Sequence, residues 1–146
     1  MLYIGSDHRG YKLKSTLKDY LEKLGYESED LGAFELDPED DYPDFALAVA
    51  KKVAENLEEN RGILICGSGV GVDVVANKTK GVRSALCFDA KQAKMSRNDD
   101  NTNVLSLAAD FISEEKAKEI VKIWLKTPFS GQERHQRRIN KIKNLE

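Results

Sequence analysis

Short apolar runs alternate along this chain with longer segments whose apolar residues recur every three or four positions, which predicts alternating strands and helices. Strands are predicted at residues 2–6, 26–31, 63–66, 82–88 and 103–108. Helices are predicted at 13–24, 42–57, from 70 or 71 onward, 89–97, 113–127 and 132–145, with loops at 32–44 and 98–102. The connections are short and no repeat or linker interrupts them. We therefore expect one α/β domain over residues 1–146, with a mainly parallel sheet and helices on both of its faces.

The turn after the third predicted strand is the most distinctive stretch. A continuous apolar run of four residues, typical of a strand buried on both faces, ends at Cys66. Gly67, Gly69 and Gly71 follow at alternate positions, so the backbone can turn tightly and point several N–H groups at one place. A helix that begins at Val70 or Gly71 would aim its N-terminal dipole at the same place. This predicts a site for a phosphate or oxyanion beside a thiol; the alternative is a glycine turn needed only for close packing.

Three well-known phosphate-binding patterns do not fit this turn. A dinucleotide-binding fingerprint needs its third glycine where Val72 stands, and it normally follows the first strand rather than the third. A P-loop needs Lys and then Ser or Thr after its last glycine, where this chain has Val72 and Asp73. A cysteine phosphatase needs an arginine six residues after its thiol, and that position is again Val72.

Polar residues elsewhere give further candidates. Asp7 and His8 follow the first predicted strand, so they are expected at the same edge of the sheet as Cys66; alternatively, Asp7 only caps the next helix. Arg134 and Arg138 lie one helical turn apart and are suited to holding one phosphate, although such a basic cluster is usually just a solvated face.

Two other features are expected to be structural. Cys87 falls within a predicted strand and is interpreted as a small core residue. The acidic run 35–44 is interpreted as a solvated loop; the alternative is a magnesium site, for which its carboxylates show no defined ligand spacing.

Composition narrows the class of protein. Hydrophobic residues make up 40% and charged residues 33% of the chain, the balance of a soluble globular domain. A net charge of −2 argues against a general nucleic-acid binder. Apolar runs fall well short of the roughly 20 residues of a membrane span, and the first residues are predicted as a strand rather than a signal peptide. Two cysteines do not suggest a disulfide framework, so a reducing cytoplasm is expected.

Several motifs together resemble the type B ribose-5-phosphate isomerase family, which also contains the galactose-6-phosphate and allose-6-phosphate isomerases. They are Gly5-Ser6-Asp7-His8-Arg9-Gly10, Asp41-Tyr42-Pro43-Asp44, Gly62-Ile63-Leu64-Ile65-Cys66-Gly67-Ser68-Gly69-Val70-Gly71, Ala76-Asn77-Lys78, Gly81-Val82-Arg83-Ser84-Ala85-Leu86, Asn103-Val104-Leu105 and Arg134-His135-x-x-Arg138. The match runs in order over essentially the whole chain.

This resemblance implies a Rossmann-like three-layer α/β/α sandwich with a five-stranded parallel sheet and a basic C-terminal helical arm over residues 131–146. It also implies a homodimer, in some members paired into a tetramer, whose pockets are built from both subunits. The implied reaction is aldose–ketose interconversion of a sugar phosphate through an enediolate, with no metal or nucleotide cofactor. From charge and hydropathy we expect no nucleic-acid or membrane partner.

The resemblance also assigns roles by position. Cys66 matches the base that moves a proton between C1 and C2, and Ser68 matches the hydroxyl residue that supports it. Backbone donors to the enediolate oxygens are matched by Gly67, Gly69, Val70 and Gly71. Sugar- and phosphate-contacting positions are matched by Asp7 and His8, and phosphate ligands by Arg134 and Arg138.

Three positions depart from the common pattern of the family. Asp99 and Asp100 stand where a His-Asn pair is usual, and Asp110 stands where an arginine usually binds phosphate. Such a pocket would lose up to two cationic groups and gain up to three carboxylates. Three interpretations stay open: an isomerase in which Asp99 or His8 handles the ring oxygen, an isomerase of a different sugar phosphate whose hydroxyls meet Asp99 and Asp100, and a non-catalytic relative that binds a phosphosugar.

Overall fold

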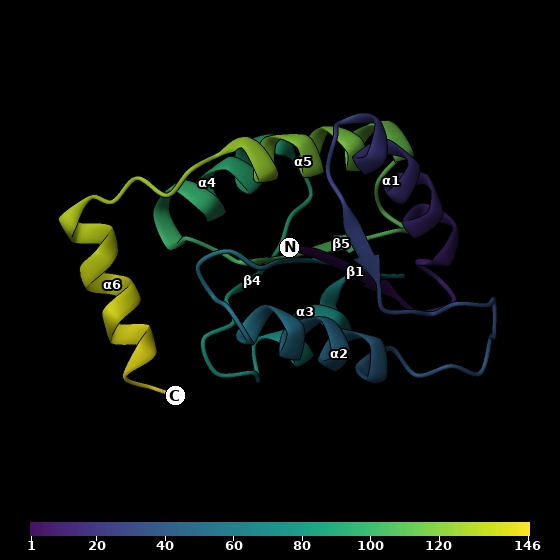
Figure 1. The fold of residues 1–146 in the computed structure, drawn as a ribbon, viewed down its shortest axis with the longest axis horizontal. Coiled ribbons are helices and arrows are strands. Elements are labelled where there is room, and N and C mark those ends of the chain that lie inside the picture. The colour runs from purple at the N-terminus through teal and green to yellow at the C-terminus, as the bar shows by residue number, and fades with distance from the viewer.

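A five-stranded parallel sheet lies between two layers of helices in the computed structural model, which describes residues 1–146 (Figure 1). The strands are β1 (Leu2–Ser6), β2 (Ser28–Asp30), β3 (Arg61–Cys66), β4 (Ser84–Leu86) and β5 (Val104–Ala108), in the order β2-β1-β3-β5-β4. The helices are α1 (Tyr11–Lys23), α2 (Tyr42–Ala54), α3 (Val70–Ala76), α4 (Ala90–Asp100), α5 (Glu114–Lys126) and α6 (Glu133–Lys143). The predicted three-layer α/β architecture is confirmed.

Alternate residues of the central strands feed two separate cores. Ile63 and Ile65 of β3 face a cluster built with α1, α4 and α5, whereas Leu64 and Cys66 face a cluster built with α2 and α3. Because both faces of β3 are covered, a continuous apolar run is what this strand requires. Figure 1 shows the two helical layers on opposite sides of the sheet.

Parallel pairing brings the loops that follow β1, β3 and β5 to one edge. Ser6 pairs with Ile65, and Cys66 pairs with Ala108, so these three strands end at nearly the same level. The turn after Cys66 is therefore flanked by the loop after Ser6 and the loop after Ala108. Ligands of open α/β sheets bind at this carboxyl edge.

Some predicted element boundaries were wrong. Residues 98–100 lie in α4 and not in a loop, because buried Arg97 holds the end of the helix by donating from Nη1 to the Thr102 carbonyl oxygen, 2.5 Å away. Strands β2 and β4 are each three residues long, shorter than predicted. Helix α2 ends at Ala54, so Leu57 lies beyond it and packs instead over the position of Gly81.

The predicted C-terminal basic helix is present as α6, which stands at one end of the molecule, away from the loop 31–41 (Figure 1). None of the helices combines the length and the apolar character that crossing a membrane would require.

Candidate active site

The turn after β3 holds a sulfur atom against backbone amides. Cys66 Sγ accepts a hydrogen bond from the Gly69 N–H at 3.1 Å. Gly69 has φ of 74°, in the left-handed region that glycine adopts without steric cost, and α3 begins at the next residue. Ser68 is exposed, and its Oγ accepts from the Val70 N–H at 3.3 Å. The turn thus brings Cys66, Ser68, Gly69 and Val70 together, as the sequence predicts.

Several N–H groups of this turn have no acceptor within the chain. Those of Gly67, Ser68 and Gly71 donate to neither a backbone carbonyl nor a side chain. Unpaired backbone donors are rare in folded proteins unless water or a ligand satisfies them. Together they can bind an anionic or strongly polarised oxygen next to the thiol.

The two cysteines have different surroundings. Both are free thiols. Cys87 is fully buried, and burial raises the pKa of its thiol to about 11, so it stays neutral, in agreement with the core role predicted for it. The Cys66 side chain is 5% exposed, and the five principal cavities of the single chain are lined by other residues. Within a single chain the thiol is therefore almost completely covered.

The loop after β1 places Asp7 and His8 at the same edge. Asp7 is buried, and its Oδ1 accepts from the N–H groups of Arg9 and Gly10, each at 3.0 Å. Asp7 thus holds the turn that leads into α1 but does not cap the helix, whose N-cap is Gly10 without a side-chain hydrogen bond. Burial is the largest influence on the Asp7 carboxyl and raises its pKa. His8 Nδ1 lies 2.6 Å from Oδ1 of Asp40, and the hydrogen bond to Asp40 raises the pKa of the imidazole.

Asp7, His8 and Asp40 are the group best placed to hold a metal ion, with one ligand atom from each within 4.8 Å of the others. However, Nδ1 and Oδ1 are only 2.6 Å apart. Ligand atoms on one tetrahedral zinc ion are separated by roughly 3.3 Å, given bonds of about 2.0 Å. The separation fits a hydrogen bond between His8 and Asp40 better than a shared metal ion.

An ion pair between Arg9 and Asp110 lies over the glycine turn. The Arg9 guanidinium donates from Nη2 to Oδ2 of Asp110, which joins the loop after β1 to the loop after β5. A Cβ atom on Gly67 would collide with the Arg9 guanidinium and would lie 2.8 Å from Asp110 Oδ2. Glycine at position 67 therefore lets the pair close over the turn, and Arg9 offsets the carboxylate that Asp110 introduces.

The remaining predicted site residues do not meet Cys66 within one chain. Helix α4 starts beyond the carboxyl end of β4 and returns to the amino end of β5, so its final residues, Asp99 and Asp100, lie at the opposite edge of the sheet. Eleven helical residues span about 16 Å at 1.5 Å per residue. Arg134 and Arg138 are exposed on α6, which contacts α4.

Asp99 is tied to the arm within its own chain. Its Oδ1 lies 3.8 Å from Nε2 of His135, a buried residue of α6, and accepts from the Asn98 amide at 2.6 Å. On the other ring nitrogen, Nδ1 of His135 is 2.7 Å from Ser130 Oγ. These contacts hold the start of α6 beside the end of α4.

The sequence analysis did not single out Asp40 or Arg9 as contacts of the site, and it noted Asp110 at a phosphate-ligand position without predicting its pair with Arg9. Asp40 was included in a loop interpreted as solvated, and for this residue that was wrong, because its side chain is only 9% exposed. Thirty-two residues separate Asp40 from His8 and 101 separate Arg9 from Asp110, so local periodicity contains no signal for either contact.

Comparison with known proteins matches nearly the whole chain. The family model described as ribose/galactose isomerase matches residues 2–142. A probable ribose-5-phosphate isomerase B of Mycoplasma genitalium is 47% identical over 141 residues, which cover 97% of this chain and 92% of that protein. Ribose-5-phosphate isomerase B of Mycobacterium tuberculosis strain H37Rv is 35% identical over 145 residues, covering 99% and 89% of the two chains.

Solved structures agree equally well. A crystal structure of ribose-5-phosphate isomerase B from Mycoplasma genitalium with bound ribulose 5-phosphate has a TM-score of 0.96 at 46% identity, with 99% of this chain and 94% of that chain covered. The type B ribose 5-phosphate isomerase of Trypanosoma brucei has a TM-score of 0.94 at 40% identity, with 99% and 97% covered. A shared fold, conserved along its whole length, and a thiol-bearing glycine turn at the ligand-binding edge lead to one conclusion: the chain belongs to the ribose/galactose isomerase family of aldose–ketose isomerases.

Proposed function

We propose that this chain interconverts an aldose phosphate and the corresponding ketose phosphate through an enediolate, with Cys66 as the base. Ribose 5-phosphate and ribulose 5-phosphate are the leading substrate pair, because relatives that match nearly the whole chain are named for ribose 5-phosphate and one structure contains ribulose 5-phosphate. The reaction would belong to pentose phosphate metabolism.

The observation that carries the proposal is the hydrogen bond from the Gly69 N–H to Cys66 Sγ at 3.1 Å, beside amides that have no partner. Donation to the sulfur stabilises a thiolate more than a thiol, because hydrogen bonds to charged acceptors are the stronger ones. A thiolate at this position takes the proton from C2 of the open-chain aldose, and the electron pair of the C–H bond moves to form the enediolate.

The second half of the reaction returns that proton to C1. The C2 oxygen becomes the ketose carbonyl, and its proton passes to the C1 oxygen with Ser68 in support. Negative charge on the oxygens is met by the N–H groups of Gly67 and Gly71, which have no acceptor within the chain and whose fixed position stabilises the enediolate without reorganisation. The N–H groups of Gly69 and Val70, which match donor positions of the family, hold Cys66 Sγ and Ser68 Oγ in place beside them.

A complete site in this proposal uses two copies of the chain, which form a homodimer or a tetramer of two dimers. Cys66 and His8 come from one copy, and Asp99, Asp100, Arg134 and Arg138 come from the other. Arg134 and Arg138 are exposed one helical turn apart, as two ligands of one phosphate should be.

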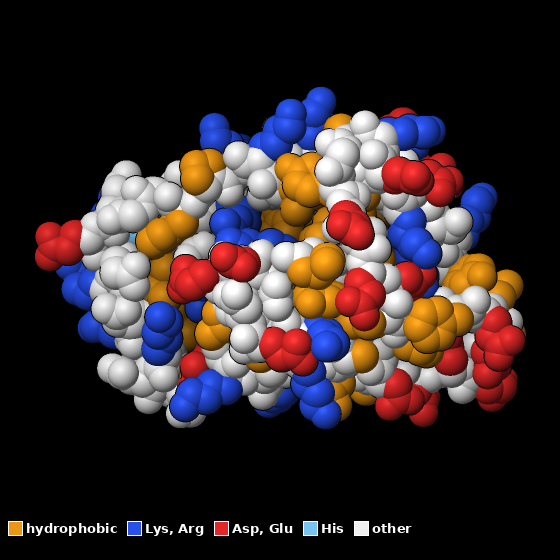
Figure 2. Space-filling view, viewed as in Figure 1, with side chains coloured by type: hydrophobic (Ala, Val, Ile, Leu, Met, Phe, Trp, Pro, Cys, Tyr) orange, Lys and Arg blue, Asp and Glu red, His pale blue; other side chains and the backbone are white.

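Surface properties support this pairing. Acidic side chains gather at the end with the loop 31–41 (Figure 2), and α6, at the other end, carries five basic residues, namely Arg134, Arg137, Arg138, Lys141 and Lys143. Beside the glycine turn, α2 and α3 expose four apolar side chains, namely Tyr42, Leu47, Val70 and Val74, each at least 40% exposed. Opposite charges on two regions of one chain favour mutual docking of two copies, and exposed apolar side chains often mark such an interface.

A cytoplasmic location is part of the proposal. Both cysteines are free, and a thiol base must stay reduced to work.

The decisive experiment is a panel of pentose and hexose phosphates followed by NMR in deuterated water. We expect turnover of at least one aldose–ketose pair, with deuterium incorporated at C1 or C2 as the enediolate is reprotonated. Hexose phosphates belong in the panel because Asp99 and Asp100 are suited to binding additional hydroxyl groups. Thermal stabilisation by sugar phosphates with neither turnover nor exchange would support the alternative of a non-catalytic binding protein.

The role of Asp99 has a separate test. If Asp99 is the acid–base group that opens the sugar ring, Asp99→Asn slows cyclic substrates more than open-chain ones. Equal losses on both kinds of substrate would remove that role.

A further inference from the structure

We infer that Asp40 is a positioning residue for His8, which it holds as an oriented imidazolium ion that binds the phosphate of the substrate. The inference rests on the proposed function and adds a residue from the acidic loop 31–41 to that site. It starts from the contacts of a single carboxylate oxygen.

Oδ1 of Asp40 accepts two hydrogen bonds from the same residue. The backbone N–H of His8 donates at 3.1 Å and ring Nδ1 lies at 2.6 Å. An ionised carboxylate has no proton to donate, so Nδ1 must carry the proton of the shorter bond. This fixes the ring by its backbone and by one nitrogen, and it leaves Nε2 as the nitrogen available to a substrate.

Apart from His8, almost nothing compensates the negative charge of the Asp40 carboxylate. Its side chain is only 9% exposed, and Oδ2 is buried without any hydrogen-bond partner. A buried carboxylate is costly unless it is paired with a charge. Protonation of His8 supplies that charge, and with it Nε2–H becomes a charged donor for a phosphate oxygen.

The charged groups that face His8 are Asp7, Arg9 and Asp40. The hydrogen bond to Asp40 is the strongest influence on His8 and raises its pKa, and the charges of Asp7 and Asp40 act in the same direction. Loss of contact with water and the charge of Arg9 act against it without reversing the shift. The pair therefore keeps His8 protonated to higher pH than an isolated histidine, whose ordinary pKa is 6.5.

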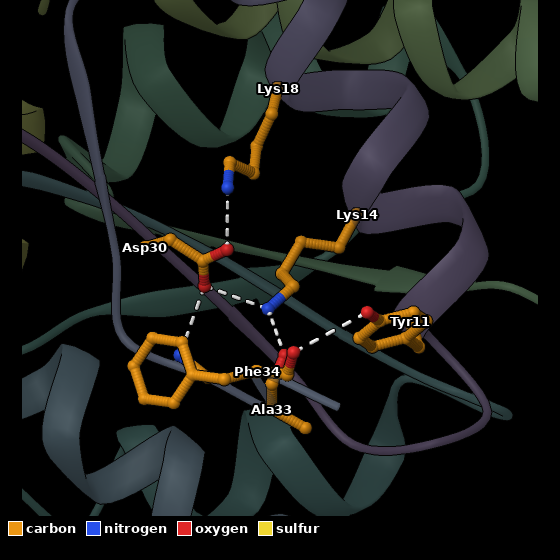
Figure 3. A network of polar contacts seen from close by, with 7 residues as sticks. Tyr11, Lys14, Lys18, Asp30, Ala33 and Phe34 are labelled. Atoms are coloured by element: carbon orange, nitrogen blue, oxygen red, sulfur yellow. Dashed lines mark hydrogen bonds and ion pairs between the residues drawn. The ribbon is translucent and has the colours of Figure 1, made fainter. Parts of the chain in front are cut away.

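A second set of contacts holds the loop that carries Asp40. Asp30, at the end of β2, accepts from Nζ of Lys14 and from Nζ of Lys18, each at 2.7 Å (Figure 3). Lys14 also donates to the Ala33 carbonyl at 2.5 Å, and the Ala33 N–H donates to the Ser6 carbonyl at 2.6 Å. The first residues of the loop are thus bound to α1 and to the end of β1, close to the start of the His8 turn.

The test uses Asp40→Asn, with Glu39→Gln as its matched control. Glu39 is the exposed neighbour of Asp40 in the same loop, and its side chain makes no hydrogen bond or ion pair. Glu39→Gln therefore removes the same amount of charge without touching His8. Asp40→Glu, which keeps a carboxylate, serves as the rescue variant if Asp40→Asn folds poorly.

The first readout is NMR titration of the imidazole rings, which needs no turnover. The chain has only two histidines, so the signals of His8 and His135 are readily assigned. We expect Asp40→Asn to lower the pKa of His8 and to leave that of His135 unchanged, while Glu39→Gln changes neither. An unchanged His8 pKa in Asp40→Asn would overturn the inference.

The second readout is the KM for the sugar phosphate as a function of pH. At pH 8 we expect KM to rise roughly tenfold in Asp40→Asn, the size of one charge-assisted hydrogen bond, with kcat nearly unchanged. At pH 6 the KM values of the variant and the wild type converge to within about twofold, because His8 is then protonated in both. Titration of the substrate phosphate changes both KM values by the same factor, so it does not affect their ratio.

The inference and the proposed function fail in different ways. If the wild type turns over no sugar phosphate, the proposed function fails, and titration with inorganic phosphate then shows whether the His8 ring still binds an anion in an Asp40-dependent way. If turnover is normal but KM at pH 8 is the same in Asp40→Asn and Glu39→Gln, the inference is wrong and the proposed function stands.

Discussion

The guanidinium group of Arg9 is paired with the carboxylate of Asp110 across the glycine turn that carries the thiol. The two residues belong to the loops after β1 and β5, and together they occupy the space that a side chain at Gly67 would need. Asp110 alone would place an uncompensated negative charge near the phosphate of a substrate. The pair offsets that charge, which makes an acidic residue at this edge compatible with the phosphate binding we propose here.

Removing one member of this pair should change substrate affinity in a predictable direction. Asp110→Asn frees the Arg9 guanidinium and removes a negative charge, so we expect KM for the sugar phosphate to fall by about two- to fivefold at low salt. Arg9→Gln exposes the Asp110 charge and should raise KM by a similar factor. Both effects should shrink as the salt concentration rises.

Stability should respond much less than affinity to these two changes. The side chains of Arg9 and Asp110 are 57% and 39% exposed, and such pairs contribute at most about 1 kcal/mol. Asp19→Asn, on the exposed face of α1, is the control for loss of one negative charge elsewhere. Equal KM values in Asp110→Asn, Arg9→Gln and the control would show that the pair does not affect the substrate.

The two thiols should differ sharply in function. Cys66→Ala is expected to reduce kcat/KM and deuterium exchange at C1 and C2 by at least ~100-fold, the scale of a lost general base. Cys87→Ala should retain both activities, because burial holds the pKa of that thiol at about 11 and it lies in the core under α4 and α5. Comparable losses in the two variants, with both proteins folded by circular dichroism, would argue against Cys66 as the base.

How well each part of the structure could be predicted depends on how far apart in the sequence its stabilising contacts lie. Strand β1 and helix α5 were predicted closely. Strand β1 begins with a run of three apolar residues and is buried throughout, and α5 has Ser113 as its N-cap and an apolar stripe at helical spacing. The segment Asn98-Asp99-Asp100 has the composition of a loop but is helical. What extends α4 is the set of contacts made by buried Arg97 with residues beyond the helix, which no local pattern reveals.

The residues of the candidate site also differ in how well they could be predicted. Cys66 and the glycine turn are one contiguous stretch, so their geometry follows from the order of residues. Asp40 meets His8, and Arg9 meets Asp110, only after the parallel sheet has aligned the ends of its strands. Contacts of this kind depend on the completed fold and could not be predicted from spacing.

Lys14 and Lys18 bind the same carboxylate, Asp30, but should contribute very differently to stability. Burial lowers the pKa of the Lys14 ammonium. Burial acts to raise the pKa of Asp30, but hydrogen bonds from the two lysines and the Gly32 N–H outweigh it, and the pKa is lowered. The Lys14 side chain is 3% exposed and that of Lys18 is 40% exposed.

We therefore expect Lys14→Ala to lower the free energy of unfolding by about 3 kcal/mol, because it leaves a partly buried carboxylate with one partner fewer. Lys18→Ala should cost less than about 1 kcal/mol, as is usual for an exposed pair. Urea denaturation of both variants measures the difference. Similar midpoints would mean that the buried ammonium contributes no more than the exposed one.

Mixing two inactive variants tests whether two copies share each active site. In the proposed dimer each site combines Cys66 of one copy with Arg138 of the other. A dimer of one Cys66→Ala chain and one Arg138→Ala chain would therefore have one site with both changes and one with neither. Random reassembly of equal amounts makes half of the dimers mixed, and half of the sites in those dimers are intact, so activity should recover to about a quarter of the wild-type value.

The assay is run at low substrate concentration, where loss of a phosphate ligand is most visible. A mixture of Cys66→Ala and Ser68→Ala, both in the same turn, is the matched control and should recover no activity. If the first mixture recovers no more than this control after verified subunit exchange, Cys66 and Arg138 do not meet across an interface, and the phosphate must be bound by residues of the same chain as the thiol.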